Sequence, residues 1–397
     1  MPTYMHPGIY IEEVGSDSRL HDRPGMVSTS TTSHPRRPQA QWFNESSTVG
    51  FVGLTSKGIV GEATYIANMG QFTALFGKSD LRNPLPLAVH GFFANGGSAC
   101  YVVPINGYDF VGDSRSRTGV SALEQLHDVS IVCAPDIVWL HREGLIDQAA
   151  VRAAQLAMIA HCEYMGDRVV LLDPPASLNA EAVLDWREDA SGFDSKYAGL
   201  FYPWIKVFAD DRTALIPPSG HVAGAWAAVD RSFGPHVSAL GRTLIGVLGT
   251  ERTTLWTERA LLHPRGVNVL DHEPGHGITI LGDRSLASDP DWRQVHRRRL
   301  ANLISRNLRE GMLWVLSSGS RPLDLLEPVR QHIEGLLTLL WRGGALRGDT
   351  PEDAFEVRCT RENNPMESMD AGQVLAEVEV VTLDGKALAL RVVHVLA

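Results

Sequence analysis

The chain has 397 residues with 44% hydrophobic and 21% charged positions, and its formal net charge is −10. This composition is that of a globular protein with ample core, and it argues against global disorder and general nucleic-acid binding. No apolar run approaches 18 residues, and no basic segment followed by an apolar one opens the chain, so we expect neither membrane insertion nor a signal peptide.

The first expected element is a short strand near the N-terminus. Ile9, Ile11 and Glu13 alternate with Tyr10 and Glu12, which is the period of a strand. The following residues, 15–32, are polar and lack a helical period. A single strand cannot form a sheet alone, so it must join an edge in its own subunit or in a neighbour. The residues by themselves favour the chain's own sheet.

The middle of the chain has the alternation of strands and helices that is typical of parallel crossover units. Residues 129–134, 168–173 and 197–208 contain expected strands, and residues 147–162 and 181–189 are expected helices. This order predicts an α/β domain.

Residues 272–276, His-Glu-Pro-Gly-His, match the H-E-x-x-H pattern of zinc hydrolases. That chemistry needs His272 and His276 on one helical face with Glu273 between them. Pro274 and Gly275 oppose a helix, and the apolar, β-branched residues that follow predict a strand. We therefore interpret the segment as a turn between strands, and keep the metal hydrolase as a remote alternative.

Other catalytic patterns are weak. Gly77-Lys78-Ser79 lacks the earlier glycine of a phosphate-binding loop at the required spacing. Asp173 before a proline is typical of a capping residue. Ser219, His221 and Asp230 lie in an expected turn and helix, without a nucleophile elbow. We expect no catalysis, no metal and no cofactor.

Residues 291–310 carry apolar positions at helical spacing together with many arginines. Two interpretations remain open: a solvated face with internal ion pairs, or a basic patch that meets carboxylates of another protein. Arg298 and Arg309 are eleven positions apart, which places them on one side of a helix. The candidate patch consists of Arg293, Arg297, Arg298, Arg306, Arg309, Arg342 and Arg347.

The C-terminus contains two further expected strands. Residues 374–381 alternate, Asp384-Gly385 is a hairpin signal, and residues 388–396 alternate again. Both ends of the chain therefore supply strands, which is the material that strand exchange between subunits would use.

Nine segments, in order, resemble contractile tail sheath proteins, the outer tubes of myophage tails, R-type tailocins and extracellular contractile injection systems. The segments span nearly the whole chain, and they are PGIYIEEV, VGFVGLTSKG, AVHGFFANGGSACYVVPI, ALEQLHDVSIVCAPD, YPWIKV, IPPSGHVAGAWAAVDRSFG, residues 264–300, LWRGGALRGDTPEDAFEVRC and DAGQVLAEVEVV.

The resemblance implies a discontinuous α+β core with an inserted α/β domain and extended β-arms. It divides the chain into an N-terminal arm (1–25), a core in two parts (26–105 and 262–378), an insertion (106–261) and a C-terminal arm (379–397). The strands that it implies at subunit contacts consist of Ile9, Tyr10, Ile11, Glu12, Glu13 and Val14 with Val374, Ala376, Val378 and Val380.

The resemblance also implies stacked hexameric rings, with the inner tube, baseplate and terminator proteins as partners. It further implies assembly in the bacterial cytoplasm, which fits four scattered cysteines without C-x-x-C spacing. A baseplate-proximal or capping paralogue of the sheath is the alternative. The sequence does not discriminate between the three kinds of particle.

Overall fold

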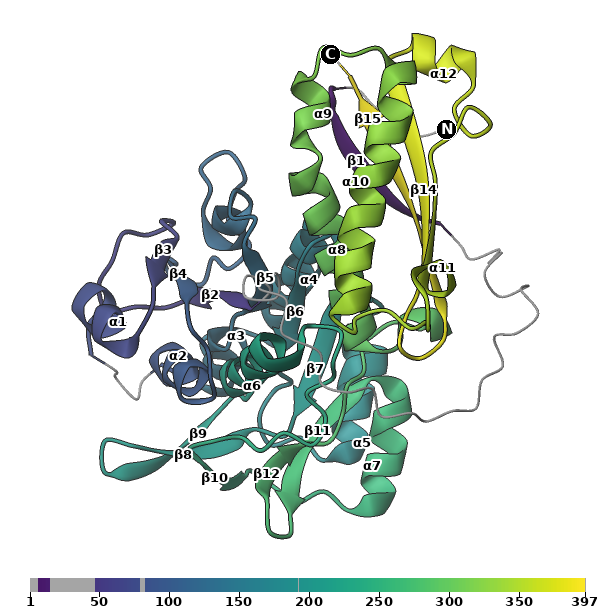
Figure 1. The fold of residues 1–397 in the computed structure, drawn as a ribbon. Coiled ribbons are helices and arrows are strands. Elements are labelled where there is room, and N and C mark those ends of the chain that lie inside the picture. The colour runs from purple at the N-terminus through teal and green to yellow at the C-terminus, as the bar shows by residue number, and fades with distance from the viewer. Residues whose placement is uncertain (1–5, 15–46, 79–82, 192, 397) are drawn as a thin grey trace. The chain divides into compact units, whose positions relative to one another are not determined.

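The computed structural model describes residues 6–14, 47–78, 83–191 and 193–396. The chain divides into two compact units (Figure 1). The terminal unit combines Met1–Gln41 with Leu300–Ala397, and the central unit is Trp42–Arg299.

The central unit is built on an eight-stranded sheet whose order is β12-β11-β7-β6-β5-β2-β4-β3. The six inner strands are parallel, and β3 and β12 are antiparallel edges. The strands are β2 (Thr48–Gly53), β3 (Thr64–Ile66), β4 (Cys100–Pro104), β5 (Val129–Cys133), β6 (Val169–Leu172), β7 (Ala198–Tyr202), β11 (Val267–Glu273) and β12 (Gly277–Ile280).

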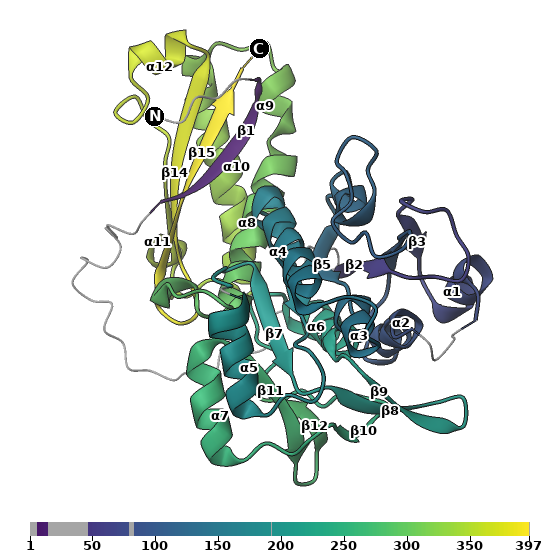
Figure 2. The ribbon, with the colours of Figure 1, turned by 180° about the vertical axis from the view of Figure 1, so that it is seen from behind.

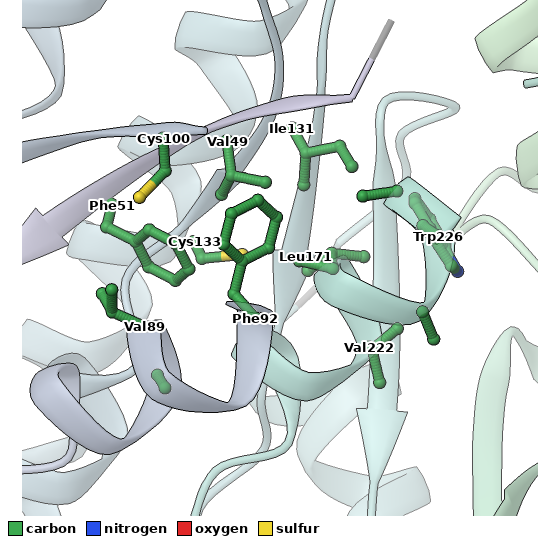
Figure 3. Close-up of a cluster of buried hydrophobic side chains, with 14 of the residues drawn as sticks. Val49, Phe51, Val89, Phe92, Cys100, Ile131, Cys133, Leu171, Val222 and Trp226 are labelled. Atoms are coloured by element: carbon green, nitrogen blue, oxygen red, sulfur yellow. The ribbon is translucent and has the colours of Figure 1, made fainter. Parts of the chain in front are cut away.

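Helices cover both faces of this sheet because its strands are apolar on both sides. Phe51 packs into one hydrophobic cluster with α2 and α6, and the next residue, Val52, packs into a second cluster with α3 and α4. Figure 3 shows the first cluster, where Phe92 of α2 lies against Phe51 of β2. The helices are α1 (Met69–Phe76), α2 (Leu85–Ala94), α3 (Asp136–Arg142), α4 (Gln148–Met165), α5 (Ala180–Asp185), α6 (Ser219–Phe233) and α7 (Trp256–Leu262).

Helices α2 and α6 approach each other closely through glycines. A Cβ atom at Gly220 would lie 2.4 Å from the carbonyl oxygen of Ala88, and one at Gly224 would lie 2.4 Å from that of Phe92. Neither position has room for a side chain. Gly220 and Gly224, one helical turn apart on α6, therefore allow the close approach of α2 and α6.

A second, three-stranded sheet of the central unit has the order β10-β8-β9. It is formed by β8 (Ile205–Ala209), β9 (Arg212–Ile216) and β10 (Val247–Thr250). The remaining helical turns are η2 (Gly119–Leu123), η3 (Trp186–Ser191), η4 (His263–Arg265) and η5 (Pro290–Trp292).

The terminal unit contains a four-stranded antiparallel sheet in the order β1-β15-β14-β13. Figure 2 shows β1, β15 and β14 side by side. Helix α10 packs on β13 and β14, and α9 packs on β15. The elements are β1 (Gly8–Val14), α8 (Val295–Gly311, which begins in the central unit), α9 (Leu313–Ser317), α10 (Pro322–Arg342), α11 (Pro351–Ala354), β13 (Phe355–Arg358), α12 (Met366–Asp370), β14 (Gln373–Val381) and β15 (Ala387–Val395).

The mixed α/β fold class expected from the sequence is confirmed. The expected domain boundaries stay a prediction; 105/106 and 261/262 both fall inside the central unit. Within that unit, β5 pairs with β2, so strands from both sides of the 105/106 boundary lie in one sheet. Within the described residues, no helix is both long and apolar enough to span a membrane. Of the expected N-terminal arm, residues 1–5 and 15–25 lie outside the described part.

Candidate functional site

The two chain ends meet in the sheet of the terminal unit. β1 pairs with β15 over seven residues, from Gly8 opposite Val395 to Val14 opposite Ala389. β15 pairs with β14 on its other edge over nine residues. Within one chain, the expected arm strand at residues 9–14 therefore completes the chain's own sheet. Pairing with a neighbour stays a prediction.

One face of this sheet is apolar. It carries the predicted positions Val374, Ala376, Val378 and Val380, none of which is more than 2% exposed. Ile9 of β1 is also buried there, directly opposite His394 of β15. Burial lowers the pKa of His394 to about 4, so the imidazole is neutral at pH 7. This face supplies most of the affinity for β1, because apolar burial dominates strand packing.

The opposite face carries a row of alternating charges, which we call the charge ladder. Glu12, Arg391, Glu377 and Arg358 lie directly opposite one another on β1, β15, β14 and β13. The Arg358 guanidinium lies 3.0 Å from the Glu377 carboxylate, and that of Arg391 lies 3.9 Å from it. Such half-exposed pairs each contribute only about 0.2–1 kcal/mol. Their main effect is to favour one register, because a shift by one residue would move every charge to the other face.

Only some arginines of the predicted basic patch are exposed, which corrects the prediction of a continuous patch. Arg297, Arg298 and Arg306 are buried, with at most 7% exposure. Arg298 stacks on Tyr197 and Trp292, each ring centroid being 4.6 Å from its guanidinium carbon.

Helical spacing indicates the side on which an arginine lies, but aromatic rings elsewhere in the chain decide whether it is covered. Arg293, Arg342 and Arg347 are exposed and Arg309 is half-buried, so a role for these four at a protein contact stays a prediction.

A buried ion pair missed by sequence reasoning lies beside these residues. Arg299 binds the carboxylate of Asp230 on α6, and its guanidinium stacks on Trp226 at 4.6 Å. Both partners are nearly fully buried. Within the central unit, the pair joins Arg299 of α8 to α6 and engages the carboxylate of Asp230.

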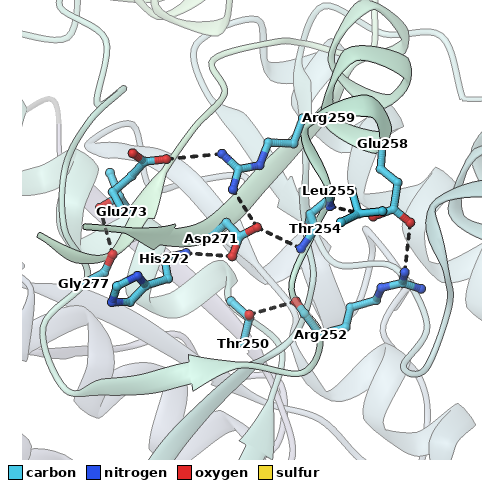
Figure 4. A network of polar contacts seen from close by, with 11 residues as sticks. Thr250, Arg252, Thr254, Leu255, Glu258, Arg259, Asp271, His272, Glu273 and Gly277 are labelled. Carbon is cyan, nitrogen blue, oxygen red and sulfur yellow. Dashed lines mark hydrogen bonds and ion pairs between the residues drawn. The ribbon is translucent and has the colours of Figure 1, made fainter. Parts of the chain in front are cut away.

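The His-Glu-Pro-Gly-His segment is a hairpin turn (Figure 4). His272 and Glu273 end β11, Glu273 pairs with Gly277 at the start of β12, and the amide of His276 donates to the carbonyl of Glu273. The carboxylate of Glu273 binds Arg259 at 3.2 Å. The described residues contain no group of three His, Cys, Asp or Glu side chains placed to hold a metal ion. The pairing of β11 with β12 confirms the turn interpretation.

Two buried aspartates lie at the carboxyl ends of adjacent strands of the parallel sheet. Asp136, after β5, accepts hydrogen bonds from the backbone amides of Leu54 (2.6 Å) and Leu85 (3.0 Å). Asp173, after β6, accepts one from the amide of Ser219 at the start of α6 (3.0 Å). Burial raises the pKa of both carboxyl groups to about 7. Doubly wound sheets bind ligands at this edge, whereas here these side chains hold loops and helices in place.

Comparison with known proteins adds the following findings. Residues 117–286 match the family model of the phage tail sheath protein central domain. A protein of Pseudomonas aeruginosa (strain UCBPP-PA14), described as a prophage major tail sheath protein, is 27% identical over 214 residues, which are 52% of this chain and 52% of that protein. The chain spans about half the length of the curated relatives that it matches.

Solved structures show a similar fold over most of the chain. A chain of the anti-feeding prophage helical sheath in its contracted state superimposes with a TM-score of 0.69 at 22% identity, covering 91% of this chain and 95% of that one. A chain of the anti-feeding prophage baseplate, 6-fold symmetrised, gives the same TM-score, identity and coverage. The expected mixed fold is thereby confirmed over about nine-tenths of the chain.

Proposed function

We propose that this chain, whose residues 117–286 belong to the phage tail sheath family and whose fold is that of sheath proteins, is the subunit of a contractile sheath. Copies of the subunit polymerise as stacked hexameric rings around an inner tube. Contraction of the polymer drives the tube through a target envelope. The observation that carries this proposal is the likeness, over nine-tenths of the chain, to a subunit of a contracted helical sheath.

The sheet built from both chain ends suits the joints of such a polymer. Backbone hydrogen bonds between strands persist while the bodies that they connect rotate, because the ladder depends little on side-chain identity. In the assembled sheath, β1 (Gly8–Val14) of one copy pairs with the C-terminal strands of a neighbour. The joint then survives contraction.

The contact with the inner tube is polar in this proposal. Arg293, Arg342 and Arg347 are exposed, and arginine pairs with carboxylates through a planar fork. Polar, solvated contacts break readily during sliding, whereas a large apolar interface would resist it. Which of these arginines meets the tube is decided by single substitutions scored for tube binding.

The subunit acts without catalysis and without a cofactor. The aspartates at the sheet edge and the former triad candidates Ser219, His221 and Asp230 serve packing, capping and ion pairing. The baseplate and terminator proteins are further partners, and assembly takes place in the bacterial cytoplasm before the particle acts.

Electron microscopy of the purified chain over a concentration series tests this proposal. We expect long, ridged, hollow tubes from the full-length protein, which would establish self-assembly through heterologous contacts. A variant that lacks residues 1–14 should remain folded by circular dichroism and should not polymerise. Robust tubes from the truncated variant would contradict the strand joint.

A baseplate-proximal or capping paralogue is a second candidate, favoured by the equal likeness to a baseplate chain. Such a protein would bind the end of a sheath and limit its growth. Compact particles at high concentration, together with termination of tubes grown from a main sheath protein, would select this candidate over the first.

A further inference from the structure

We infer that the free chain is a closed form, in which its own β1 occupies the docking edge of β15 and must leave before a second copy's β1 can bind. This inference rests on the proposed strand joint, and adds how that joint is kept from forming too early. The ligand of the docking edge is residues 8–14 of a second copy.

The hydrogen-bonding edges of β15 carry the first argument. β14 occupies one edge, from Gln373 opposite Val395 to Val381 opposite Ala387. β1 occupies the other edge, from Gly8 opposite Val395 to Val14 opposite Ala389. Both edges of β15 are therefore filled along most of its length. An incoming strand must displace β1 or add outside it.

The side chains around the edge favour displacement by an identical strand. A second β1 in the same register regains the opposition of Glu12 to Arg391 and the burial of Ile9 opposite His394. A second β1 could instead pair with the outer edge of the first β1. If its Glu12 then kept its position along the sheet, it would lie opposite Glu12 of the first β1 rather than opposite Arg391. Like charges opposite each other destabilise a strand pair.

A second copy's β1 makes nearly the same contacts with β15 as the chain's own β1, so the exchange changes the free energy little. The effective concentrations of the two strands therefore decide which of them is bound. Only 33 residues, 15–47, connect β1 to the start of β2, and they can span at most about 110 Å. A segment held on its own chain has an effective concentration on the order of mM, above that of free copies at µM.

A free chain is therefore closed, whereas a copy docked at the end of a growing sheath finds a neighbour's β1 at a comparable effective concentration. We therefore expect free subunits to begin a new tube slowly, after a lag, and to add faster to the end of an existing one.

A disulfide lock tests the closed form in the full-length chain. Tyr10→Cys with Val393→Cys joins β1 to β15, because these residues are direct register partners. Leu375→Cys with Val393→Cys is the matched control: it shares one substitution and joins β14 to β15 instead. Directly opposed antiparallel pairs have Cα separations that a disulfide can bridge. The four native cysteines are buried.

Two readouts separate this inference from the proposed function. The first is binding of a dye-labelled peptide of residues 6–14, HPGIYIEEV. At peptide concentrations on the order of mM, which match the effective concentration of the chain's own β1, we expect the peptide to bind slowly to the reduced lock and to the oxidised control. The rate of this binding should be independent of peptide concentration, and the oxidised lock should bind no peptide. Equal peptide binding by the oxidised and reduced lock would overturn the inference, because β1 would not need to leave.

The second readout is elongation of sheared tubes by added subunits. We expect the oxidised lock to add at least tenfold more slowly than its reduced form, and the oxidised control to elongate normally. Normal elongation by the oxidised lock would also overturn the closed form. If the peptide behaves as expected but no chain forms tubes, the closed form stands and the proposed sheath function fails.

Discussion

The carboxylate of Asp136 accepts a hydrogen bond from the backbone amide of Leu54, with 2.6 Å between oxygen and nitrogen. Leu54 directly follows β2, and Asp136 begins α3 behind the adjacent strand β5. Strand order changes direction at this point, which is where doubly wound sheets usually bind a ligand. A Cβ atom at Gly53 would lie 2.5 Å from the same carboxylate. The side chain of Asp136 therefore occupies this position of the sheet edge and ties the ends of β2 and β5 together.

Asp136→Asn should lower the free energy of unfolding by about 2–4 kcal/mol, because one of the two buried amides would face a donor instead of an acceptor. Urea denaturation measures this change. Asp147→Asn is the control: Asp147 caps α4 in an exposed position, accepting from the amide of Ala150. Asparagine caps as well as aspartate, so the control should change stability by less than about 0.5 kcal/mol. Equal losses in both variants would contradict the role of Asp136.

The sequence predicts this fold best where a pattern is local. Alternation alone places β1 and β14, and Pro274 with Gly275 identifies the hairpin within an apparent metal motif. The partner of β1 is different, because the same alternation suits the chain's own sheet and a neighbour's. Charge density is also a poor guide to exposure. Arg298 is covered by Tyr197, about a hundred residues earlier, and no local pattern reports that contact.

The buried arginines should behave as core residues. Arg298→Ala removes a guanidinium stacked on two aromatic rings, and should cost about 2–4 kcal/mol of stability through lost packing and cation–π contacts. Arg293→Ala, on the exposed surface, should stay within about 0.5 kcal/mol of the wild type. Thermal and urea unfolding compare the two. An unchanged stability of Arg298→Ala would restore the interpretation of Arg298 as a surface patch residue.

The glycines of α6 should not tolerate a methyl group. Gly224→Ala places Cβ 2.4 Å from the carbonyl oxygen of Phe92, so α2 and α6 must separate, at a cost of about 1–3 kcal/mol. Gly335→Ala is the control, because Gly335 lies within α10 and its Cβ would meet no atom within 4 Å. This substitution should stabilise the helix by about 0.5–1 kcal/mol. A urea midpoint lower than that of the wild type for Gly224→Ala and higher for Gly335→Ala would support the close contact. Shifts of the midpoint in the same direction for both variants would refute it.

His394 should make the terminal sheet sensitive to acid. Burial lowers its pKa to about 4 in the folded chain, whereas the ordinary value is 6.5. The neutral imidazole therefore contributes stability above pH 6.5, and this contribution is lost as the pH falls toward 4. In His394→Leu, which cannot titrate, the free energy of unfolding should fall less between pH 7.5 and pH 5 than in the wild type.

His276→Leu, in the exposed turn between β11 and β12, is the control for this comparison. Its pH dependence should follow that of the wild type. If His394→Leu loses as much stability as the wild type over the same pH range, another group causes the acid sensitivity.

The charge ladder should make a small contribution to the strength with which β1 is held on β15. Glu12→Arg places a second arginine opposite Arg391, and like charges directly opposed weaken a strand pair by about 1 kcal/mol. Opening of β1 is then about five-fold more frequent, which amide hydrogen exchange of residues 8–14 measures directly. The effect should shrink in 1 M salt, because the charges are partly exposed and screened. Glu362→Arg, in the exposed loop between β13 and α12, should leave this exchange unchanged. Exchange of residues 8–14 that is equally slow in Glu12→Arg and in the wild type would show that apolar burial alone holds β1.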